Sequence, residues 1–165
     1  MKLKLVAATA ALILAIAGVF VFTQKPVAPD VAFSTVQGQT FRTADLHGKV
    51  VLVNFWATTC TSCIKEMPAL KATQEKFEAR GYQTVAVAMD YDPPAQVAAF
   101  VERNPLPFTF VLDRDGSIAR GFDGVRLTPT SFIVNRRGEI VQKILGEPKL
   151  DALDALIEKL LAEPA

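Results

Sequence analysis

The stretch NFWATTCTSCIKEMP, Asn54–Pro68, contains both cysteines of the chain, Cys60 and Cys63, with two residues between them. An apolar run of β-forming residues, Val50–Trp56, leads into it, and a helical pattern of apolar residues continues from Cys60 to Ala79. A continuous apolar run of this length is typical of a strand that is buried on both faces of a sheet. The stretch therefore predicts a cysteine pair at the end of a buried strand and at the start of a helix.

The spacing of the two cysteines favours redox chemistry. Residues i and i+3 of a helix have Cβ atoms about 5–6 Å apart, so the pair can form and break a disulfide without refolding the domain. Near a helix start, the Cys60 sulfur would lie beside free N–H groups that stabilise a thiolate. A staple closing so short a loop would contribute much less than the roughly 2–4 kcal/mol of an ordinary disulfide. A zinc site needs about four ligands, and His47 is the only histidine; a staple and an intermolecular metal site remain the alternatives.

The rest of the chain alternates strand and helix signals, which predicts an α/β sandwich with a mixed sheet and helices on both faces. A hairpin around Gly38 comes first, and a second hairpin spans Thr130–Leu145. Asp92 is interpreted as the cap of a helix that begins with two prolines. The other predicted elements are strands at Thr84–Met89 and Phe108–Leu112, a short helical turn at Ser117–Arg120, and a helix at Pro148–Ala162.

The N-terminal residues predict a membrane anchor. Residues 5–23 are uncharged and would span roughly 28 Å as a helix, close to the thickness of a bilayer core. Lys2 and Lys4 precede the run, so residues 1–4 are expected in the cytoplasm and the chain from about residue 26 onward outside it. Residues 24–29 are interpreted as a linker and residues 30–165 as one domain. A signal peptide cleaved after Ala15–Ala17 is the alternative.

The balance of basic and acidic residues gives no indication of a surface that binds nucleic acid. Without its first 25 residues the chain has 15 basic and 17 acidic residues. A nucleic-acid-binding domain normally has a clear basic excess. No nucleic-acid partner is therefore predicted.

Two motifs, GKVVLVNFWATTCTSCIKEMP at 48–68 and LTPTSFIV at 127–134, resemble those of membrane-anchored thiol:disulfide reductases of the TlpA and ResA type, with a redoxin layout. The resemblance implies a thioredoxin-like three-layer sandwich with a mixed central sheet, an N-terminal β-hairpin and an inserted helix at Asp92–Asn104. It also implies that the catalytic domain faces the periplasm from the bacterial inner membrane.

The same resemblance assigns roles to individual residues. Cys60 matches the nucleophile and Cys63 the resolving thiol, while Trp56 matches the aromatic residue packed beneath them. Pro129 matches a cis-proline facing the disulfide, which would turn the Thr128 backbone outward toward an extended substrate. Pro68 matches the proline that kinks the active-site helix.

Five further positions are candidates for tuning or substrate contact. Glu66 lies on the same side of the helix as Cys63, where a buried carboxyl of raised pKa could exchange a proton with that sulfur; a solvated Glu66 is the alternative. Asn54 stands where thioredoxin has a buried aspartate, and an amide cannot relay protons. Thr59 replaces a tryptophan common in the family, and Thr61 and Ser62 could hydrogen-bond a sulfur.

The predicted function is reduction of protein disulfides by the Cys60–Cys63 pair, without metal or other cofactor. The resemblance suggests apocytochrome c or a copper-assembly factor as substrate, and a membrane thiol-electron donor would recharge the pair. A peroxiredoxin-like peroxidase is one alternative, although Ala57 stands three residues before Cys60 where that family has threonine. A Sco-like copper-binding protein is the other, although His47 precedes the cysteine pair.

Overall fold

The computed structural model describes residues 25–164, so the predicted anchor at 5–23 lies outside the described residues. Between residues 25 and 164, no helix is both long enough and apolar enough to cross a membrane. A mixed five-stranded sheet in the order β5-β4-β3-β6-β7 forms the centre. Strands β3, β4 and β5 are parallel, whereas β6 pairs antiparallel with both β3 and β7. The bounds are β3 Val50–Trp56, β4 Tyr82–Ala88, β5 Thr109–Leu112, β6 Thr130–Val134 and β7 Ile140–Leu145.

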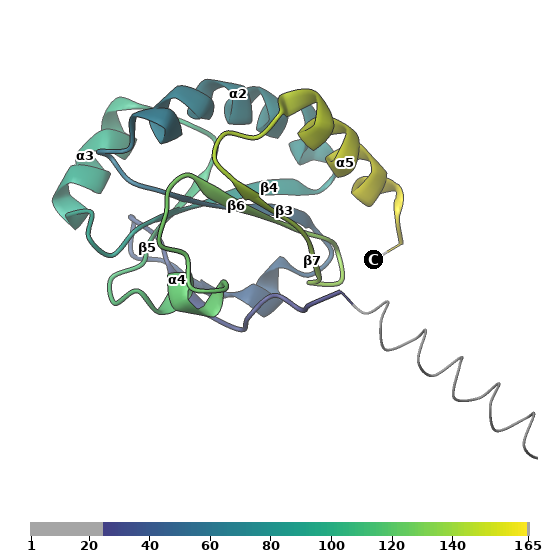
Figure 1. The fold of residues 1–165 in the computed structure, drawn as a ribbon, viewed down its shortest axis with the longest axis horizontal. Coiled ribbons are helices and arrows are strands. Elements are labelled where there is room, and N and C mark those ends of the chain that lie inside the picture. Colours follow the sequence, from purple (N-terminus) through teal and green to yellow (C-terminus); the bar gives the residue numbers. More distant parts are fainter. Residues whose placement is uncertain (1–24, 165) are drawn as a thin grey trace, which may run out of the picture.

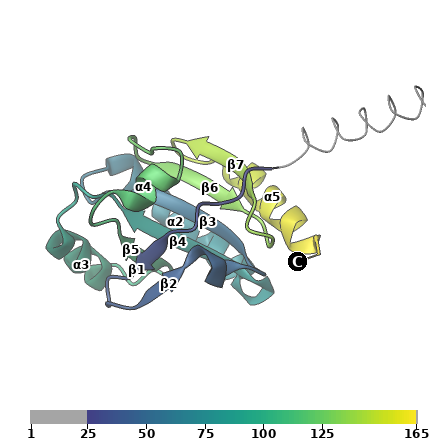
Figure 2. The same cartoon turned by 90° about the horizontal axis from the view of Figure 1, so that it is seen from below.

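Helices and a hairpin cover the two faces of this sheet, which gives the three layers expected from the sequence (Figure 1). One face carries α2 (Thr61–Phe77), α3 (Pro94–Arg103) and α5 (Leu150–Ala162). The other face carries α4 (Ser117–Gly121), the 3₁₀ helix η1 (Thr43–Leu46) and the hairpin of β1 (Ala32–Ser34) and β2 (Thr40–Arg42) (Figure 2). The predicted α/β sandwich with a mixed sheet and N-terminal hairpin is confirmed.

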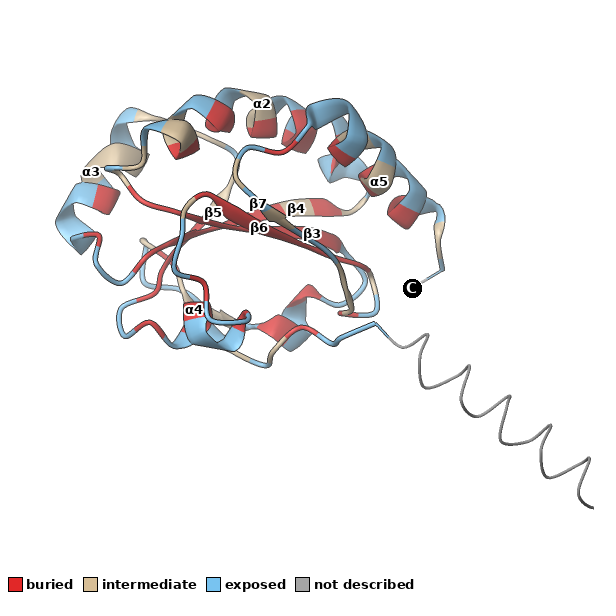
Figure 3. Ribbon diagram, in the orientation of Figure 1, coloured by how far each residue is buried: buried red, intermediate tan, exposed pale blue. Residues whose placement is uncertain are grey.

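Strand β3 runs through the middle of the sheet, and all its residues are buried (Figure 3). Successive side chains of a strand point to opposite faces. Val51, Val53 and Phe55 accordingly pack in the core beneath α4, whereas Trp56 packs with Cys63 on the face that α2 covers. Asn54 is the one polar residue of β3, and the other six are apolar because both faces of the strand are covered. The end of β3 leads directly to the cysteine pair.

The chain packs against the domain before residue 30, the start expected from the sequence. The Ala28 N–H donates to the Gly138 carbonyl at 2.8 Å, and the Ile140 N–H donates to the Pro26 carbonyl at 2.7 Å. The Ala28 side chain is also buried. Residues 26–28 therefore hold the turn between β6 and β7.

The interpretation of Asp92 as a helix cap is wrong. Helix α3 begins at Pro94 after Pro93 in the N-cap position, and no side chain caps it. The Asp92 carboxylate instead accepts hydrogen bonds from the backbone N–H and the hydroxyl of Thr58, in the loop after β3. A partner distant in sequence has replaced the local cap that the sequence pattern favours.

Candidate active site

Cys60 and Cys63 form a disulfide with an S–S distance of 2.05 Å and a Cα–Cα distance of 5.2 Å. Cys60 is the N-cap of α2, and its Sγ accepts the Cys63 N–H at 3.2 Å. Cys63 is only 1% exposed, whereas Cys60 is partly exposed. An incoming sulfur can therefore reach Cys60 and not Cys63.

The surroundings of Cys60 suit a thiolate in the reduced protein. The first N–H groups of a helix lack partners within the helix and present the positive end of its dipole. A sulfur at the N-cap is therefore stabilised as an anion, which is the nucleophilic form. The Ser62 hydroxyl lies 3.5 Å from the Cys60 sulfur and adds a second polar neighbour.

Trp56 supports the pair from beneath and has no exposed surface. Its ring packs against Phe100 of α3 and Phe110 of β5, with centroid distances of 5.0 and 5.6 Å. Trp56 belongs to the same apolar cluster as Cys63. It was predicted as a substrate-binding residue, but its burial leaves it no surface that a substrate could contact.

Glu66 is buried on the inner side of α2, with 5% of its surface exposed, so the solvated alternative is wrong. Its Oε1 accepts a hydrogen bond of 2.8 Å from the Asn54 amide, and among the described residues its buried Oε2 has no partner. Burial raises the pKa of Glu66 from 4.5 to about 7; the Asn54 hydrogen bond opposes this rise, and the charge of Glu147 adds to it. A carboxyl with such a pKa can both give and take a proton near neutral pH.

The loop before β6 lies near the disulfide, since Thr128 and Cys60 line the same depression. Its Thr128–Pro129 peptide bond is cis. Pro129 is buried, and its carbonyl accepts the Gly146 N–H at 2.8 Å, while Thr128 is partly exposed. Within residues 25–164, neither the N–H nor the carbonyl of Thr128 is hydrogen-bonded. Both groups are therefore free to pair with the main chain of a bound peptide.

An open depression surrounds the Cys60 sulfur. Its predicted lining residues Thr59, Thr61, Ser62 and Thr128 do come together there. Three residues that were not predicted complete it: Tyr91, Lys65 and Glu147.

The unpredicted residues come from three separate segments. Tyr91 is 57% exposed, and its hydroxyl lies 3.4 Å from the Thr128 hydroxyl. Lys65 pairs with Glu147 at 3.5 Å. A sequence signal for Tyr91 existed, because it follows the buried strand β4, and loops after neighbouring parallel strands meet at one edge of a sheet.

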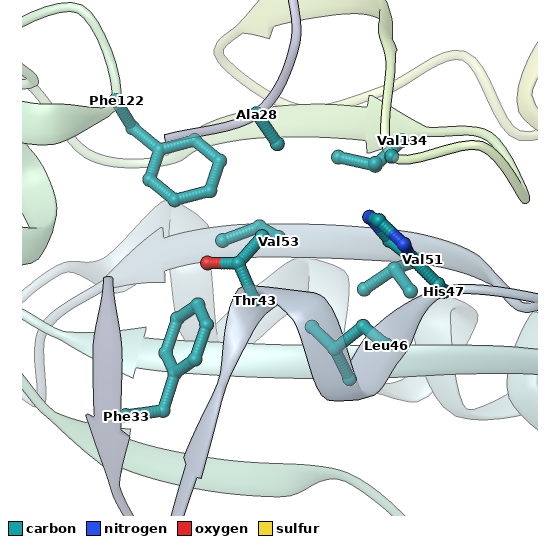
Figure 4. A pocket seen from close by; sticks show the side chains of 10 residues that line it. Ala28, Phe33, Thr43, Leu46, His47, Val51, Val53, Phe122 and Val134 are labelled. Atoms are coloured by element: carbon teal, nitrogen blue, oxygen red, sulfur yellow. The ribbon is translucent and has the colours of Figure 1, made fainter. Parts of the chain in front are cut away.

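His47 lies away from the cysteine pair. It lines a small apolar cavity with Val51 and Val53 of β3 (Figure 4). Those side chains point to the face opposite Asn54 and Trp56, so the sheet separates His47 from the disulfide. Across residues 25–164, no three His, Cys, Asp or Glu side chains gather in a way that could hold a metal ion. The Sco-like alternative requires a histidine near the cysteine pair, and His47 does not lie there.

Comparison with known proteins gives consistent matches. The sequence matches the Redoxin family over residues 23–157. It is 32% identical over 133 residues to the thiol-disulfide oxidoreductase ResA of Bacillus thuringiensis subsp. konkukian, covering 81% of this chain and 76% of the relative. ResA of Geobacillus kaustophilus is 30% identical over 145 residues, covering 84% and 82% of the two chains.

Solved structures show the same similarity. A thiol:disulfide interchange protein of the thioredoxin family from Chlorobium tepidum TLS superimposes with a TM-score of 0.76 and 26% identity, covering 85% of this chain and 99% of the other. MTB dsbF superimposes with a TM-score of 0.73 and 27% identity, covering 83% and 99%. The expected thioredoxin-like fold is confirmed.

Proposed function

Because the chain belongs to the Redoxin family and is a thiol:disulfide oxidoreductase of the ResA type, we propose that it reduces protein disulfides, with Cys60 as the attacking thiol and Cys63 as the resolving thiol. The observation that carries this assignment is the difference in exposure between the two residues. Cys60 is partly exposed at a helix start, and Cys63 is 1% exposed beneath it. Thiol–disulfide exchange needs an accessible thiolate for its first step and a shielded partner for its second.

The exchange proceeds in two steps. The Cys60 thiolate attacks one sulfur of a substrate disulfide, forms a mixed disulfide and releases the other substrate sulfur as a thiolate. The Cys63 thiol then loses its proton and attacks the Cys60 sulfur, which breaks the mixed disulfide and releases the second substrate thiolate. Two electrons pass to the substrate, and the Cys60–Cys63 disulfide forms without any further cofactor. Glu66, three residues after Cys63, is the proposed acceptor of the Cys63 proton.

The substrate is proposed to bind as an extended segment beside Thr128. The two unpaired main-chain groups of Thr128 would pair with its backbone, while Thr59, Thr61 and Ser62 contact its flanks. Pro129 shapes this loop from within. The family suggests apocytochrome c haem-site cysteines, or the cysteines of a copper-assembly factor, as natural substrates.

The proposed location is the outer face of a bacterial inner membrane. The uncharged run at 5–23, preceded by Lys2 and Lys4, supports a single anchor with its N-terminus in the cytoplasm. Soluble thiols cannot recharge the pair in an oxidising compartment, so a membrane protein that donates thiol electrons would be its partner.

A trapping experiment tests the chemistry. Cys63→Ala should accumulate mixed disulfides between Cys60 and its substrates, visible as species on non-reducing gels that dithiothreitol removes. Cys60→Ala is the matched control and should trap none, because its remaining cysteine is buried. Equal trapping by both variants would contradict the assignment. So would the absence of trapped species in Cys63→Ala, if the wild-type protein also failed to accelerate the reduction of insulin by dithiothreitol.

The direction of transfer needs its own measurement. An oxidase and a reductase share this chemistry and differ in reduction potential, where about 30 mV corresponds to a tenfold change in the equilibrium constant. Equilibration of Cys60–Cys63 with glutathione gives that potential. A reductase requires a value below that of the glutathione couple, and a value near that of the strong oxidant DsbA, about −120 mV, would contradict the proposal.

A further inference from the structure

Asp92 lies in the segment after β4, and its carboxylate binds the loop in which Cys60 lies. Its two oxygens accept hydrogen bonds from the Thr58 N–H at 2.5 Å and from the Thr58 hydroxyl at 2.6 Å. Asp92 is only 4% exposed, although it belongs to a loop. A buried carboxylate is costly unless it is hydrogen-bonded, so these two bonds are the reason it can lie there.

The loop after β3 is held at several points along its length. The Met89 N–H donates to the Trp56 carbonyl at 3.0 Å, one residue before the loop starts. Asp92 then holds Thr58, and the Cys60 N–H closes a turn onto the Ala57 carbonyl at 3.0 Å. Thr58 therefore lies inside the turn that presents Cys60.

We propose that Asp92 is a positioning residue for disulfide exchange, which holds the Thr58 turn so that the Cys60 sulfur stays within reach of Cys63 when the pair is reduced. Asp92 touches neither sulfur and acts only through Thr58. The inference rests on the exchange activity of the pair and does not depend on the direction proposed above.

A looser turn would lower the effective concentration of one sulfur at the other. Fixed geometry is what makes an intramolecular step fast, and its loss slows that step. Without the Asp92–Thr58 bonds we expect the equilibrium constant for forming the Cys60–Cys63 disulfide, measured against glutathione, to fall threefold to tenfold. A tenfold fall corresponds to about 30 mV toward a more oxidising potential.

The test uses variants at both ends of the interaction. Thr58→Val removes the hydroxyl at nearly constant volume, and Thr58→Ser keeps it; Asp92→Ala removes both acceptors. Each variant is equilibrated with glutathione buffers at pH 7, its thiols are alkylated, and the oxidised fraction is measured by mass spectrometry. Thermal unfolding of the oxidised form is recorded for each.

Thr73→Val is the matched structural control. Thr73 is a buried threonine whose hydroxyl, like that of Thr58, donates to an aspartate, here Asp154 at 2.9 Å; this pair joins α2 to α5. Its loss should lower the Tm and leave the glutathione equilibrium within twofold of the wild type.

We expect the equilibrium constant for forming the Cys60–Cys63 disulfide to fall at least threefold in Thr58→Val. In Thr58→Ser it should stay within twofold of the wild type. The effects of Thr58→Val and Asp92→Ala should also combine less than additively, because both remove the same bond. If Asp92→Ala does not fold, Thr58→Val and Thr58→Ser decide alone. An equilibrium within twofold of the wild type for Thr58→Val, with a Tm lowered as in Thr73→Val, would overturn the inference. The change in this equilibrium constant between variant and wild type can be measured whether the protein acts as a reductase or as an oxidase. The test of Asp92 therefore still holds if the proposed direction of transfer is wrong.

Discussion

The side-chain amide of Asn54 donates a 2.8 Å hydrogen bond to the buried carboxyl of Glu66. The same amide donates to the Ser131 hydroxyl at 3.0 Å, across the β3–β6 pairing. Asn54 thereby joins the centre of the sheet to the active-site helix. The amide of Asn54 and the hydroxyl of Ser131 do not ionise near neutral pH, so Glu66 is the one of these three residues that can titrate near pH 7.

The raised pKa of Glu66 predicts that ionising it costs stability. The folded protein holds the Glu66 proton more tightly than the unfolded chain does, so the stability that the neutral carboxyl contributes is fully present below about pH 4.5 and is lost as the pH rises through about 7. Glu66→Gln removes this dependence. The free energy of unfolding of Glu66→Gln relative to the wild type should therefore rise by roughly 2–3 kcal/mol between pH 5 and pH 8. Urea unfolding of the two oxidised proteins at pH 5 and at pH 8 measures this difference.

The oxidised form is the right sample for that comparison, since its disulfide cysteines do not titrate. Glu75→Gln supplies the control, because Glu75 is exposed on the same helix. Its difference from the wild type should stay nearly constant over this range. A difference for Glu66→Gln that is equally constant would show that Glu66 does not ionise with a raised pKa.

Asn54→Asp should place two carboxyls side by side beneath the disulfide. Like charges in one buried site disfavour ionisation of both, so the pair would titrate in two coupled steps. We expect a loss of roughly 3 kcal/mol at pH 8, where a buried charge is left uncompensated, and a much smaller loss at pH 5. Ser131→Ala removes the other hydrogen bond of Asn54 without adding charge. Its loss should be independent of pH, and a similar loss for both variants at both values would contradict the coupling.

The sequence predicted most elements and the reacting atoms because their causes are local. The apolar run of β3, the helical spacing after Cys60 and the turn residues of the hairpins depend on neighbours along the chain. The contacts of Asp92 with Thr58 and of Tyr91 with Thr128 join residues more than 30 positions apart. Local pattern assigned Asp92 to a helix cap, since only the folded sheet brings Thr58 close enough to compete.

Phe122→Ala should separate stability from chemistry. The Phe122 ring packs against Phe55 and Phe132, with centroid distances of 5.7 and 5.3 Å, on the face opposite the disulfide. Loss of this ring should cost about 3–5 kcal/mol of unfolding free energy. The exchange rate with a small disulfide, measured well below the new Tm, should stay within twofold of the wild type. A large fall in that rate, with the folded fraction unchanged, would mean that the two faces are coupled.

Tyr91 is expected to contact the substrate. Its ring is exposed, lines the depression around Cys60, and holds its hydroxyl 3.4 Å from that of Thr128. Tyr91→Ala should raise the KM for a protein disulfide threefold to tenfold, because an exposed aromatic ring offers a large apolar contact to a partner. Its rate with a small disulfide should change less than twofold, since that reagent needs only the Cys60 sulfur.

Tyr91→Phe divides this effect between the ring and the hydroxyl. If the ring makes the contact, Tyr91→Phe retains the wild-type KM; if the hydroxyl orients Thr128, it behaves like Tyr91→Ala. Val27 is 70% exposed and pairs in a short bridge with Glu139, away from the depression, so Val27→Ala is the control for loss of exposed apolar surface. An unchanged KM for Tyr91→Ala, or an equal rise for Val27→Ala, would exclude Tyr91 from the contact. Steady-state reduction of insulin and of a small disulfide by the same samples gives both numbers.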